Sequence, residues 1–146
     1  MPRRKKPGIS PAARRKLSAA RVARLATISR TGPHLVPICF AYDGSFFYTA
    51  IDRKPKRVAA HRLGRLKNIK RNPQVALLID EYREDWTRLW YVLVRGKAEL
   101  VSGAGQREQA LRRLQKKYRQ YARGMLPEDA LLLRITPQRI TVWGKM

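Results

Sequence analysis

Cysteine is almost absent from this chain. Cys39 is the only one in 146 residues, which excludes an intrachain disulfide and a zinc site built from several cysteines. No apolar run approaches the roughly 20 residues that cross a bilayer, and no apolar core follows the basic N-terminus as it does in a signal peptide. From these absences we expect a cytoplasmic protein.

The short motifs of several common enzymes are also missing. There is no Gly-rich phosphate loop, no GxGxxG after a strand, no GxSxG elbow and no HExxH. His34 and His61 lie far apart in sequence and outside any ligand-spaced motif, and Cys39 sits among apolar residues as a core residue does. We therefore expect no metal site, and we assign no catalytic residue.

Acidic residues are scarce. The chain has 10 Asp and Glu against 33 Lys and Arg, a formal net charge of +23. Residues 1–42 contain no acid, and the segment from Arg53 to Arg71 holds nine basic residues and no acidic one. Such a chain attracts polyanions, including nucleic acid at low salt, whatever its specific ligand.

The two ends of the chain differ in character from its middle. Residues 1–9 form a basic tail that we expect to be mobile, because its charges repel one another and nothing apolar holds it. Residues 10–146 are expected to form a single domain. Ser10 followed by Pro11 predicts a helix that begins there and extends to about Val22.

Beyond this helix, periodicity predicts about seven strands and two further helices. The first three strands are expected as a meander, with turns at Thr31-Gly32-Pro33 and Asp43-Gly44. One helix ends before Asn72-Pro73, and a bulge is expected at Gly96. The strands are expected at 24–30, 34–42, 45–51, 74–82, 87–101, 130–136 and 138–144, and an amphipathic helix is expected at 106–121. Short antiparallel strands favour a closed or nearly closed barrel, because closure removes exposed edges.

Three segments together resemble a known family. They are TGPHLVPICFAYDG with FFYTAIDRKPKR, then RLGRLKNIKRNPQVALLID, then DWTRLWYVLVRGKAEL. They are similar to the pyridoxamine 5'-phosphate oxidase-like FMN-binding split-barrel superfamily, and most closely to its branch of probable F420-dependent oxidoreductases. The resemblance covers about residues 13–144. RLxNIxxNPxV and the KPK loop are moderately specific for the superfamily, and DWTRLW is more specific for the branch.

The resemblance implies a fold, an assembly and an activity. The fold is mainly β (α+β), a six- to seven-stranded antiparallel split β-barrel with flanking helices. The assembly is a homodimer with two equivalent cofactor sites, each where one subunit meets the other. The activity is hydride transfer from a flavin-type cofactor, F420 in preference to FMN, to a small organic acceptor that the sequence does not identify.

The resemblance also implies which residues line the cofactor site. Val36, Pro37 and Ile38 would lie along the edge of the ring. Tyr48, Thr49, Ala50 and Ile51 would run beside the ring and the ribityl chain. Lys54, Lys56, Arg57, Lys67 and Asn68 would surround the phosphate. Trp86, Arg88 and Trp90 of the second subunit, with Trp143 as a further candidate, would close the pocket.

The chemistry of two of these segments, the Lys-Pro-Lys loop and DWTRLWY, supports part of this implied cofactor site. In a Lys-Pro-Lys loop the proline stiffens the backbone between two ammonium groups, which suits a phosphate, although Lys54 and Lys56 are otherwise typical solvated loop charges. Strand alternation in DWTRLWY would put Trp86, Arg88 and Trp90 on one face. An arginine between two indoles suits either a planar ring or packing at a dimer interface.

Redox chemistry on a flavin needs few protein groups, since the cofactor carries it. Tyr48 or a solvent molecule would supply the second proton. Extra cations at Arg53, Arg57 and Arg62 favour F420, which has a longer acidic tail than FMN.

Two other functions stay open from the sequence. A haem- or tetrapyrrole-binding barrel would use His34 or His61 as axial ligand. A nucleic-acid-binding protein would use the tail and the Arg53–Arg71 segment, but no aromatic residues interleave there for base stacking, so we expect only non-specific binding.

Overall fold

The computed structural model describes residues 7–51, 59–126 and 129–146, with side chains in the second range from Gly64 onward. Most of the predicted tail lies outside these residues, and so do Lys54, Lys56 and Arg57. The elements are α1 Pro11–Ala19, β1 Ala23–Ser29, β2 Gly32–Ile38, β3 Ala41–Tyr42, β4 Phe47–Ile51, α2 Ala59–Arg71, β5 Gln74–Glu81, η1 Trp86–Arg88, β6 Trp90–Leu100, α3 Ala104–Lys117, η2 Tyr121–Met125 and β7 Leu131–Gly144.

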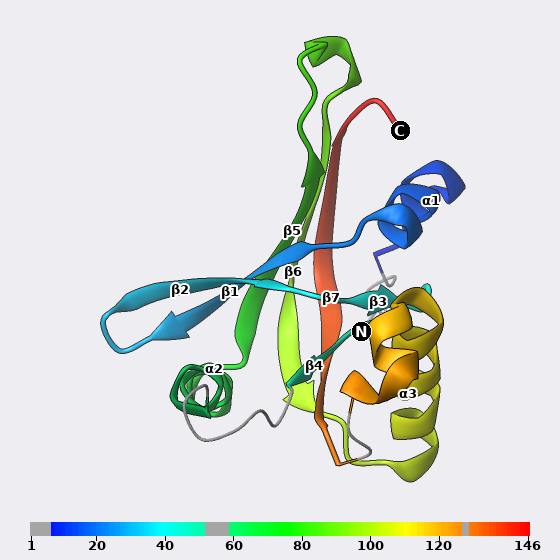
Figure 1. The fold of residues 1–146 in the computed structure, drawn as a ribbon. Coiled ribbons are helices and arrows are strands. Elements are labelled where there is room, and N and C mark those ends of the chain that lie inside the picture. The colour runs from blue at the N-terminus through cyan, green and yellow to red at the C-terminus, as the bar shows by residue number, and fades with distance from the viewer. Residues whose placement is uncertain (1–6, 52–58, 127–128) are drawn as a thin grey trace, which may run out of the picture.

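The strands of the described residues form one antiparallel sheet in the order β2-β1-β5-β6-β7-β4-β3. β2 and β3 lie at opposite ends of this order, yet only Cys39 and Phe40 separate them in the chain. The three Cα–Cα steps from Ile38 to Ala41 span at most about 11 Å. The outer strands must therefore come together at this point, so the sheet curls into a barrel open along one side (Figure 1). The predicted mainly β split barrel with flanking helices is confirmed.

Local sequence signals correctly predicted the start of the first helix and the turn at Asp43. Ser10 Oγ accepts the backbone N–H of Ala13 at 3.1 Å, as an N-cap does. The helix ends at Ala19, a few residues before the predicted end, because Ala20 is already extended. Asp43 Oδ1 accepts the N–H groups of Ser45 and Phe46 at 2.7 Å each and so fixes the predicted hairpin turn.

The predicted strand over 34–42 breaks at Phe40, so the three-strand meander is wrong. The Phe40 N–H donates to the hydroxyl of Tyr118 at 3.1 Å, and that hydroxyl lies 2.9 Å from the carbonyl oxygen of Arg21. The Tyr118 hydroxyl, just beyond α3, thus accepts the N–H that would otherwise donate to a carbonyl of a neighbouring strand. The sequence pattern carries no sign of this partner, which is 78 residues away.

The two predicted C-terminal strands form one strand, β7. The pairing of β6 with β7 shifts register between Arg95 and Gly96, and Gly96 lies opposite Pro137. Proline has no N–H to pair, so it belongs at such an irregularity. A Cβ at Gly96 would overlap the Thr136 carbonyl oxygen and lie 3.2 Å from Pro137 Cα. The predicted bulge at Gly96 is confirmed, and it lets β7 continue through its proline.

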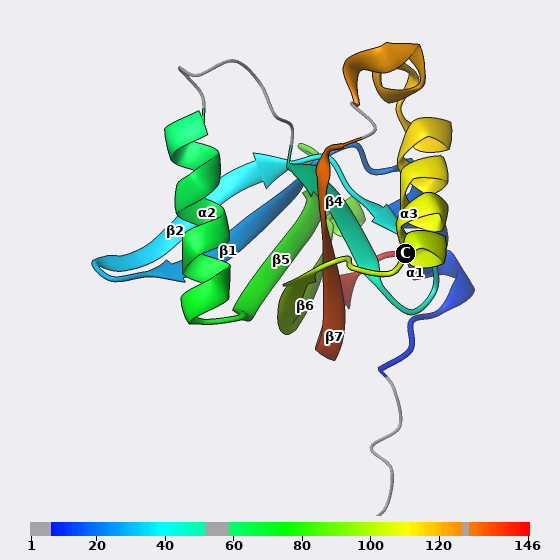
Figure 2. The same ribbon diagram turned by 90° about the horizontal axis from the view of Figure 1, so that it is seen from below.

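Two hydrophobic clusters hold the helices on the sheet. The larger fills the barrel interior, and Leu17 of α1 with Leu66 and Ile69 of α2 belong to it. The smaller lies between α3 and the strands β3, β4 and β7, and contains Ala41, Tyr48, Ala50, Ala110, Leu114, Tyr118, Leu126, Ala130 and Leu132. Figure 2 shows α2 along β1 and β2 and α3 beside β3 and β4. None of the described helices is long and apolar enough to span a membrane.

Lys117, at the end of α3, carries an ammonium group in an apolar setting. Its Nζ donates to the Leu17 carbonyl at 3.1 Å and lies 3.7 Å from the centre of the Phe40 ring. Burial, helped by the nearby Arg21, lowers the pKa of Lys117 from 10.5 to about 8. The folded state therefore releases this proton at a lower pH than the unfolded chain does.

This shift predicts a pH dependence of stability. Between the folded pKa of about 8 and the unfolded value of 10.5, the unfolded chain binds more protons at Lys117, so stability rises with pH. In urea titrations, we expect the free energy of unfolding of the parent, relative to that of Lys117→Met, to increase between about pH 7.5 and about pH 9.5. A parent-to-variant difference that stays constant over this range would contradict the assignment.

Candidate functional site

β2 and β4 each leave one backbone edge unpaired where the barrel is open. Among the described strands, β2 pairs only with β1, and Thr49–Ile51 of β4 pair only with β7, because β3 covers β4 at Phe47 and Tyr48 alone. The edges converge at Cys39, whose carbonyl accepts the hydroxyl of Thr49 at 2.7 Å. We call this region the β2–β4 opening. Its free N–H and C=O groups are available to hydrogen-bond a ligand.

The two segments predicted to lie beside a cofactor ring border this opening from both sides. Val36 of β2 is half-buried, and Pro37 is exposed. Ile38 is buried and lies next to Cys39 in the chain. Across the opening, Thr49, Ala50 and Ile51 are all buried. The structure thus brings the two segments to one place, and their contact with a ring stays a prediction.

Tyr48 lies on the other face of β4. Its side chain belongs to the cluster under α3, it is 3% exposed, and its hydroxyl donates to Asp43 Oδ2 at 3.2 Å. Burial first, and then the charge and hydrogen bond of Asp43, raise the pKa of Tyr48 to about 12. A phenol held so firmly in its neutral form and turned toward α3 is a poor proton donor to a ring in the opening. We therefore assign no proton transfer to Tyr48.

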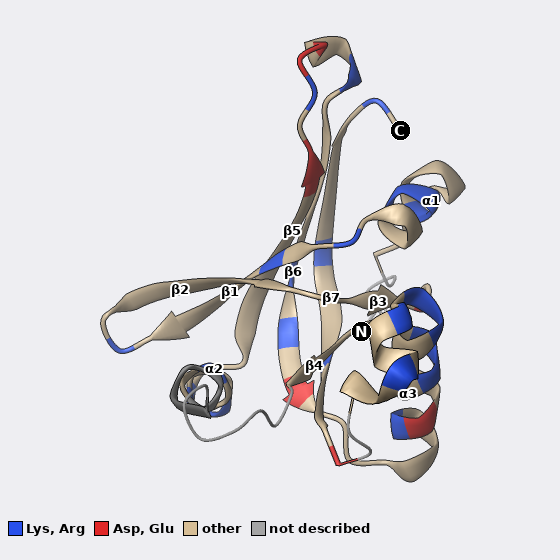
Figure 3. Ribbon diagram, in the orientation of Figure 1, with Lys and Arg blue, Asp and Glu red and all other residues tan. Residues whose placement is uncertain are grey.

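A cationic cleft of about 800 Å³ lies between α2 and the β1–β2 turn. The turn leads into the N-terminal end of β2, whereas Cys39 follows its C-terminal end, so the cleft and Cys39 lie at opposite ends of β2. Figure 3 shows basic residues on α2 and at this turn. The lining residues are Ser29, Arg30, Thr31, Gly64, Lys67, Asn68, Lys70 and Arg71.

Two of the predicted phosphate residues, Lys67 and Asn68, line this cleft. Lys67 is exposed, as a residue that binds an anion from solution must be. Asn68 is 8% exposed and donates to Thr27 Oγ1 at 3.2 Å, so it fixes α2 to β1. Arg71 donates to the Ile28 carbonyl at 3.2 Å and ties the same two elements together. Sequence reasoning missed Arg30, for which the only signal was a basic residue beside a predicted turn.

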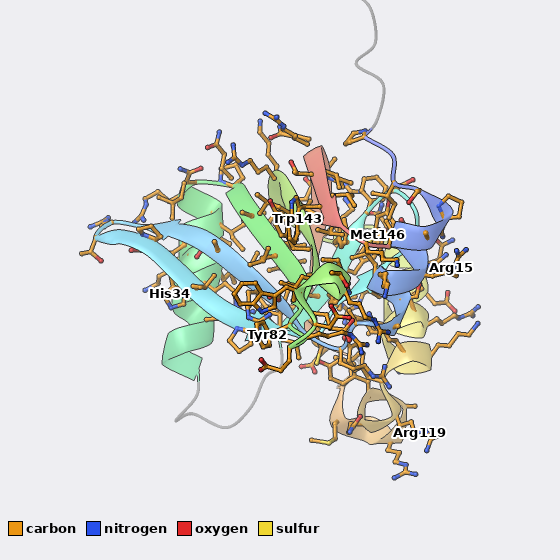
Figure 4. All side chains as sticks on the ribbon, turned by 90° about the horizontal axis from the view of Figure 1, so that it is seen from above. Arg15, His34, Tyr82, Arg119, Trp143 and Met146 are labelled. Carbon is orange, nitrogen blue, oxygen red and sulfur yellow. The ribbon has the colours of Figure 1, made fainter. Side chains whose placement is uncertain are left out.

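His34 lies close to this cleft but faces the barrel. It pairs with Thr27 across β1 and β2, so both side chains point to the face that α2 covers. Figure 4 labels His34 in this position beside α2. Its Nδ1 is buried and has no hydrogen-bond partner among the described residues. The side chain of His61, the other histidine, lies outside the described residues.

The predicted alternation of Trp86, Arg88 and Trp90 on one strand face is wrong. Residues 86–88 form the short helix η1, because Asp85 Oδ1 accepts both the N–H of Thr87 at 3.1 Å and its hydroxyl at 2.6 Å. Trp86 is 71% exposed, whereas Trp90 is 4% exposed and donates to Glu81 Oε2 at 2.9 Å. Arg88 is therefore not held between two indoles.

Trp86, Arg88 and Trp90 also lie far from α2 in the same chain. They belong to the β5–β6 tip, and Figure 1 shows this tip and α2 at opposite ends of the sheet. Within one copy of the chain, Trp86, Arg88 and Trp90 therefore do not lie beside Lys67 and Asn68. Their predicted place in the cofactor site of a second subunit stays a prediction.

The outer face of the sheet carries exposed apolar side chains that no described helix covers. Leu35 is 65% exposed, Ile28 41% and Trp143 50%, and strand alternation puts them on the face opposite the barrel interior. Trp143 stacks on Tyr91 with ring centres 5.5 Å apart. A cavity of about 330 Å³ lies beside this face, lined by Ala26, Thr27, Ile28, Pro33, Gln74, Val75, Ala76, Arg95, Gly96 and Gln138.

The fold and the site together define a split-barrel protein whose opening ends in a basic cleft. The family model described as pyridoxamine 5'-phosphate oxidase matches residues 9–144. The chain therefore belongs to the pyridoxamine 5'-phosphate oxidase family. No protein of curated function matches it in a sequence comparison.

Solved structures share this fold at low sequence identity. The FAD-binding protein of Mesorhizobium loti is 24% identical with a TM-score of 0.65, over 92% of this chain and 94% of that one. The FAD-binding protein of Mycobacterium smegmatis is 19% identical with a TM-score of 0.63, over 93% and 95%. The haem storage protein HutZ of Vibrio cholerae is 18% identical with a TM-score of 0.71, over 94% and 97%. At these identities the similarity establishes the fold alone.

Proposed function

We propose that this protein is an oxidoreductase that binds a phosphorylated flavin or deazaflavin along the β2–β4 opening, with the phosphate in the basic cleft of α2. The observation that carries the proposal is the position of that cleft at the turn that leads into the unpaired edge of β2. Backbone groups that can bind a polar ring edge and cations that can bind a phosphate then follow one another along β2. The FAD-binding proteins of the same fold support a flavin-type cofactor.

The bound cofactor would supply the hydride chemistry, so the protein's own groups bind and orient it. The edges of β2 and Thr49–Ile51 hold the ring by their free N–H and C=O groups, which need no reorganisation during the reaction. The buried side chains of Ile38, Thr49 and Ile51 keep water from the barrel side of the ring. Lys67 pairs with the phosphate, and Asn68 keeps α2 in position through Thr27.

We prefer F420 to FMN as the cofactor. Arg30, Lys70 and Arg71 line the same cleft as Lys67, which is more positive charge than one phosphate monoester of FMN needs. F420 carries a phosphodiester and an acidic tail, so it would use several of these cations. The resemblance of DWTRLW to the F420 branch supports the same choice.

The site that we propose is shared between two copies of the chain. The exposed Leu35, Ile28 and Trp143 give the outer sheet face an apolar surface of the kind that a second subunit covers. Trp86 is 71% exposed and belongs to the β5–β6 tip, which Figure 1 shows at the end of the sheet away from α2. A homodimer built on this face would let the tip of one copy close the opening of the other.

A haem-binding function is the alternative that one observation favours. HutZ has the same fold, and the unpaired Nδ1 of His34 belongs to an imidazole beside the cleft. The ring of His34 faces the barrel under α2, however, which leaves little room for a planar macrocycle at its nitrogen atoms.

Titration of the purified protein with FMN, F420 and haem tests these choices together. The proposal predicts quenching of flavin or deazaflavin fluorescence with micromolar affinity, tighter for F420. A Soret band that appears with haem and is lost in His34→Ala, without any flavin or F420 binding, would replace the proposal by the haem alternative.

A further inference from the structure

A second group of basic side chains gathers at the end of the sheet opposite α2. Lys16, Arg83, Arg88 and Lys145 line one pocket of about 140 Å³ together with Met146. They come from α1, the β5–β6 connection, η1 and the segment after β7, which are far apart in sequence. Figure 1 shows these segments at the end away from α2, and Figure 4 shows Met146 between Trp143 and Arg15 of α1.

Specific contacts hold the segments that carry these cations. Lys16 Nζ lies 5.7 Å from the centre of the Trp90 ring, within the range of a cation–π contact. The N–H of Lys145 donates to the Leu89 carbonyl at 3.2 Å. This approach requires Gly144, which has φ +94° and at which a Cβ would lie 2.7 Å from Trp90 Cα. Asp85 caps η1 and so fixes the backbone of Arg88.

Among the side chains that line this pocket and the space beside it, the basic ones outnumber the acidic ones four to one. Glu81 is the one carboxylate that lines the adjoining space, and its two oxygens are taken by Arg83 at 2.6 Å and the Trp90 indole at 2.9 Å. The Trp90 hydrogen bond, and then Arg83 and Lys16, lower the pKa of Glu81. Asp85 is engaged with Thr87. Across the described ranges, Lys16, Arg88 and Lys145 form no ion pair within 4 Å.

Like charges held together repel one another, and a bound anion would relieve that repulsion. The volume of about 140 Å³ is several times the roughly 30 Å³ of one water molecule, which leaves room for a phosphate or carboxylate group. A further space of about 400 Å³ shares Lys16 and Arg83 with this pocket and is also lined by Ala19, Ala20, Trp90 and the already paired Glu81. An apolar body attached to the anion would fit there.

We propose that Lys16, Arg83, Arg88 and Lys145 form a binding site for a small organic anion, with its phosphate or carboxylate among the cations and its apolar body against Ala19, Ala20 and Trp90. The inference does not depend on which cofactor occupies the β2–β4 opening. It adds to the proposed function a second ligand site at the other end of the sheet.

The test compares phenyl phosphate, benzoate, inorganic phosphate and neutral phenol in calorimetric titrations of the full chain at low salt. We expect phenyl phosphate or benzoate to bind more tightly than inorganic phosphate, and phenol not to bind. In Lys16→Gln/Lys145→Gln the affinity for the organic anion should fall about tenfold, since two charged contacts are lost. The matched control is Lys116→Gln on α3 combined with Arg119→Gln just beyond this helix, which removes the same charge at exposed positions and should bind as the parent does.

Three results would overturn the inference. They are equal affinity for phenyl phosphate and inorganic phosphate, equal loss of binding in both double variants, and no loss in Lys16→Gln/Lys145→Gln. Titration of the same variants with FMN and F420 separates the two proposals. If the organic anion binds the parent but no cofactor does, then the proposed function fails and this site stands.

Discussion

Lys67→Glu is expected to weaken binding of F420 or FMN about 100-fold, because it removes one charge-assisted contact to the phosphate and adds a repulsive charge in its place. Lys67 is exposed on α2 and faces the basic cleft, so the substitution leaves the hydrophobic clusters intact. The measurement is the Kd from cofactor fluorescence quenching, together with thermal unfolding to verify the fold.

A control is needed because the whole protein is cationic. Lys116→Glu on α3 changes the net charge by the same amount at an exposed position away from the cleft. It should bind the cofactor within about twofold of the parent, since screened charges beyond about 10 Å contribute little. If both variants lose affinity equally, the cofactor is attracted by net charge and the cleft is not its phosphate site.

Gly144→Ala is expected to lower the free energy of unfolding by about 3 kcal/mol, which corresponds to a Tm lower by about 10 °C. Two causes act together: Gly144 has φ +94°, and its new Cβ would overlap the Leu89 carbonyl oxygen. The β6–β7 pairing would have to open at Trp90, which is opposite Gly144 in the sheet. Urea unfolding at one pH measures the change.

Gly105→Ala is the control for Gly144→Ala. Gly105 lies in the first turn of α3, and a Cβ there would meet nothing within 4 Å. This substitution should leave stability unchanged or raise it by up to about 1 kcal/mol, as alanine does in a helix. A Gly144→Ala variant as stable as Gly105→Ala would show that the end of β7 does not lie against Leu89 and Trp90 as described.

Features set by neighbouring residues could be predicted from the sequence. The Ser10 cap, the Asp43 turn and the end of α2 before Asn72-Pro73 each depend on contacts or steric limits within a few residues, and each was placed correctly. The Gly96 bulge also followed from the sequence pattern, although its partner Pro137 did not. The split-barrel fold came from the combination of these signals with the family resemblance.

Features set by distant residues could not be predicted in this way. The break at Phe40 needs the hydroxyl of Tyr118, and the anion pocket needs Lys16 and Lys145 from opposite ends of the chain. The DWTRLW segment alternates like a strand, but Asp85 turns it into η1 through a local hydrogen bond that periodicity does not report. Likewise, Tyr48 faces α3 because an amphipathic helix covers that side of β4.

Several predictions from the sequence remain untested by the fold. The single domain over 10–146, the homodimer, the cytoplasmic location and the choice of F420 are among them. The phosphate contacts of Lys54, Lys56 and Arg57 lie outside the described residues. Lys67 and Asn68 are the members of that set whose position in a basic cleft is described.

The most direct test of the central proposal is native mass spectrometry of the full chain with F420 or FMN. A cofactor held where two copies meet predicts a dimer that carries two cofactor molecules, and loss of both in Lys67→Glu without loss of the dimer. A monomer that binds one cofactor, or a dimer that binds none at micromolar concentration, would contradict the proposal.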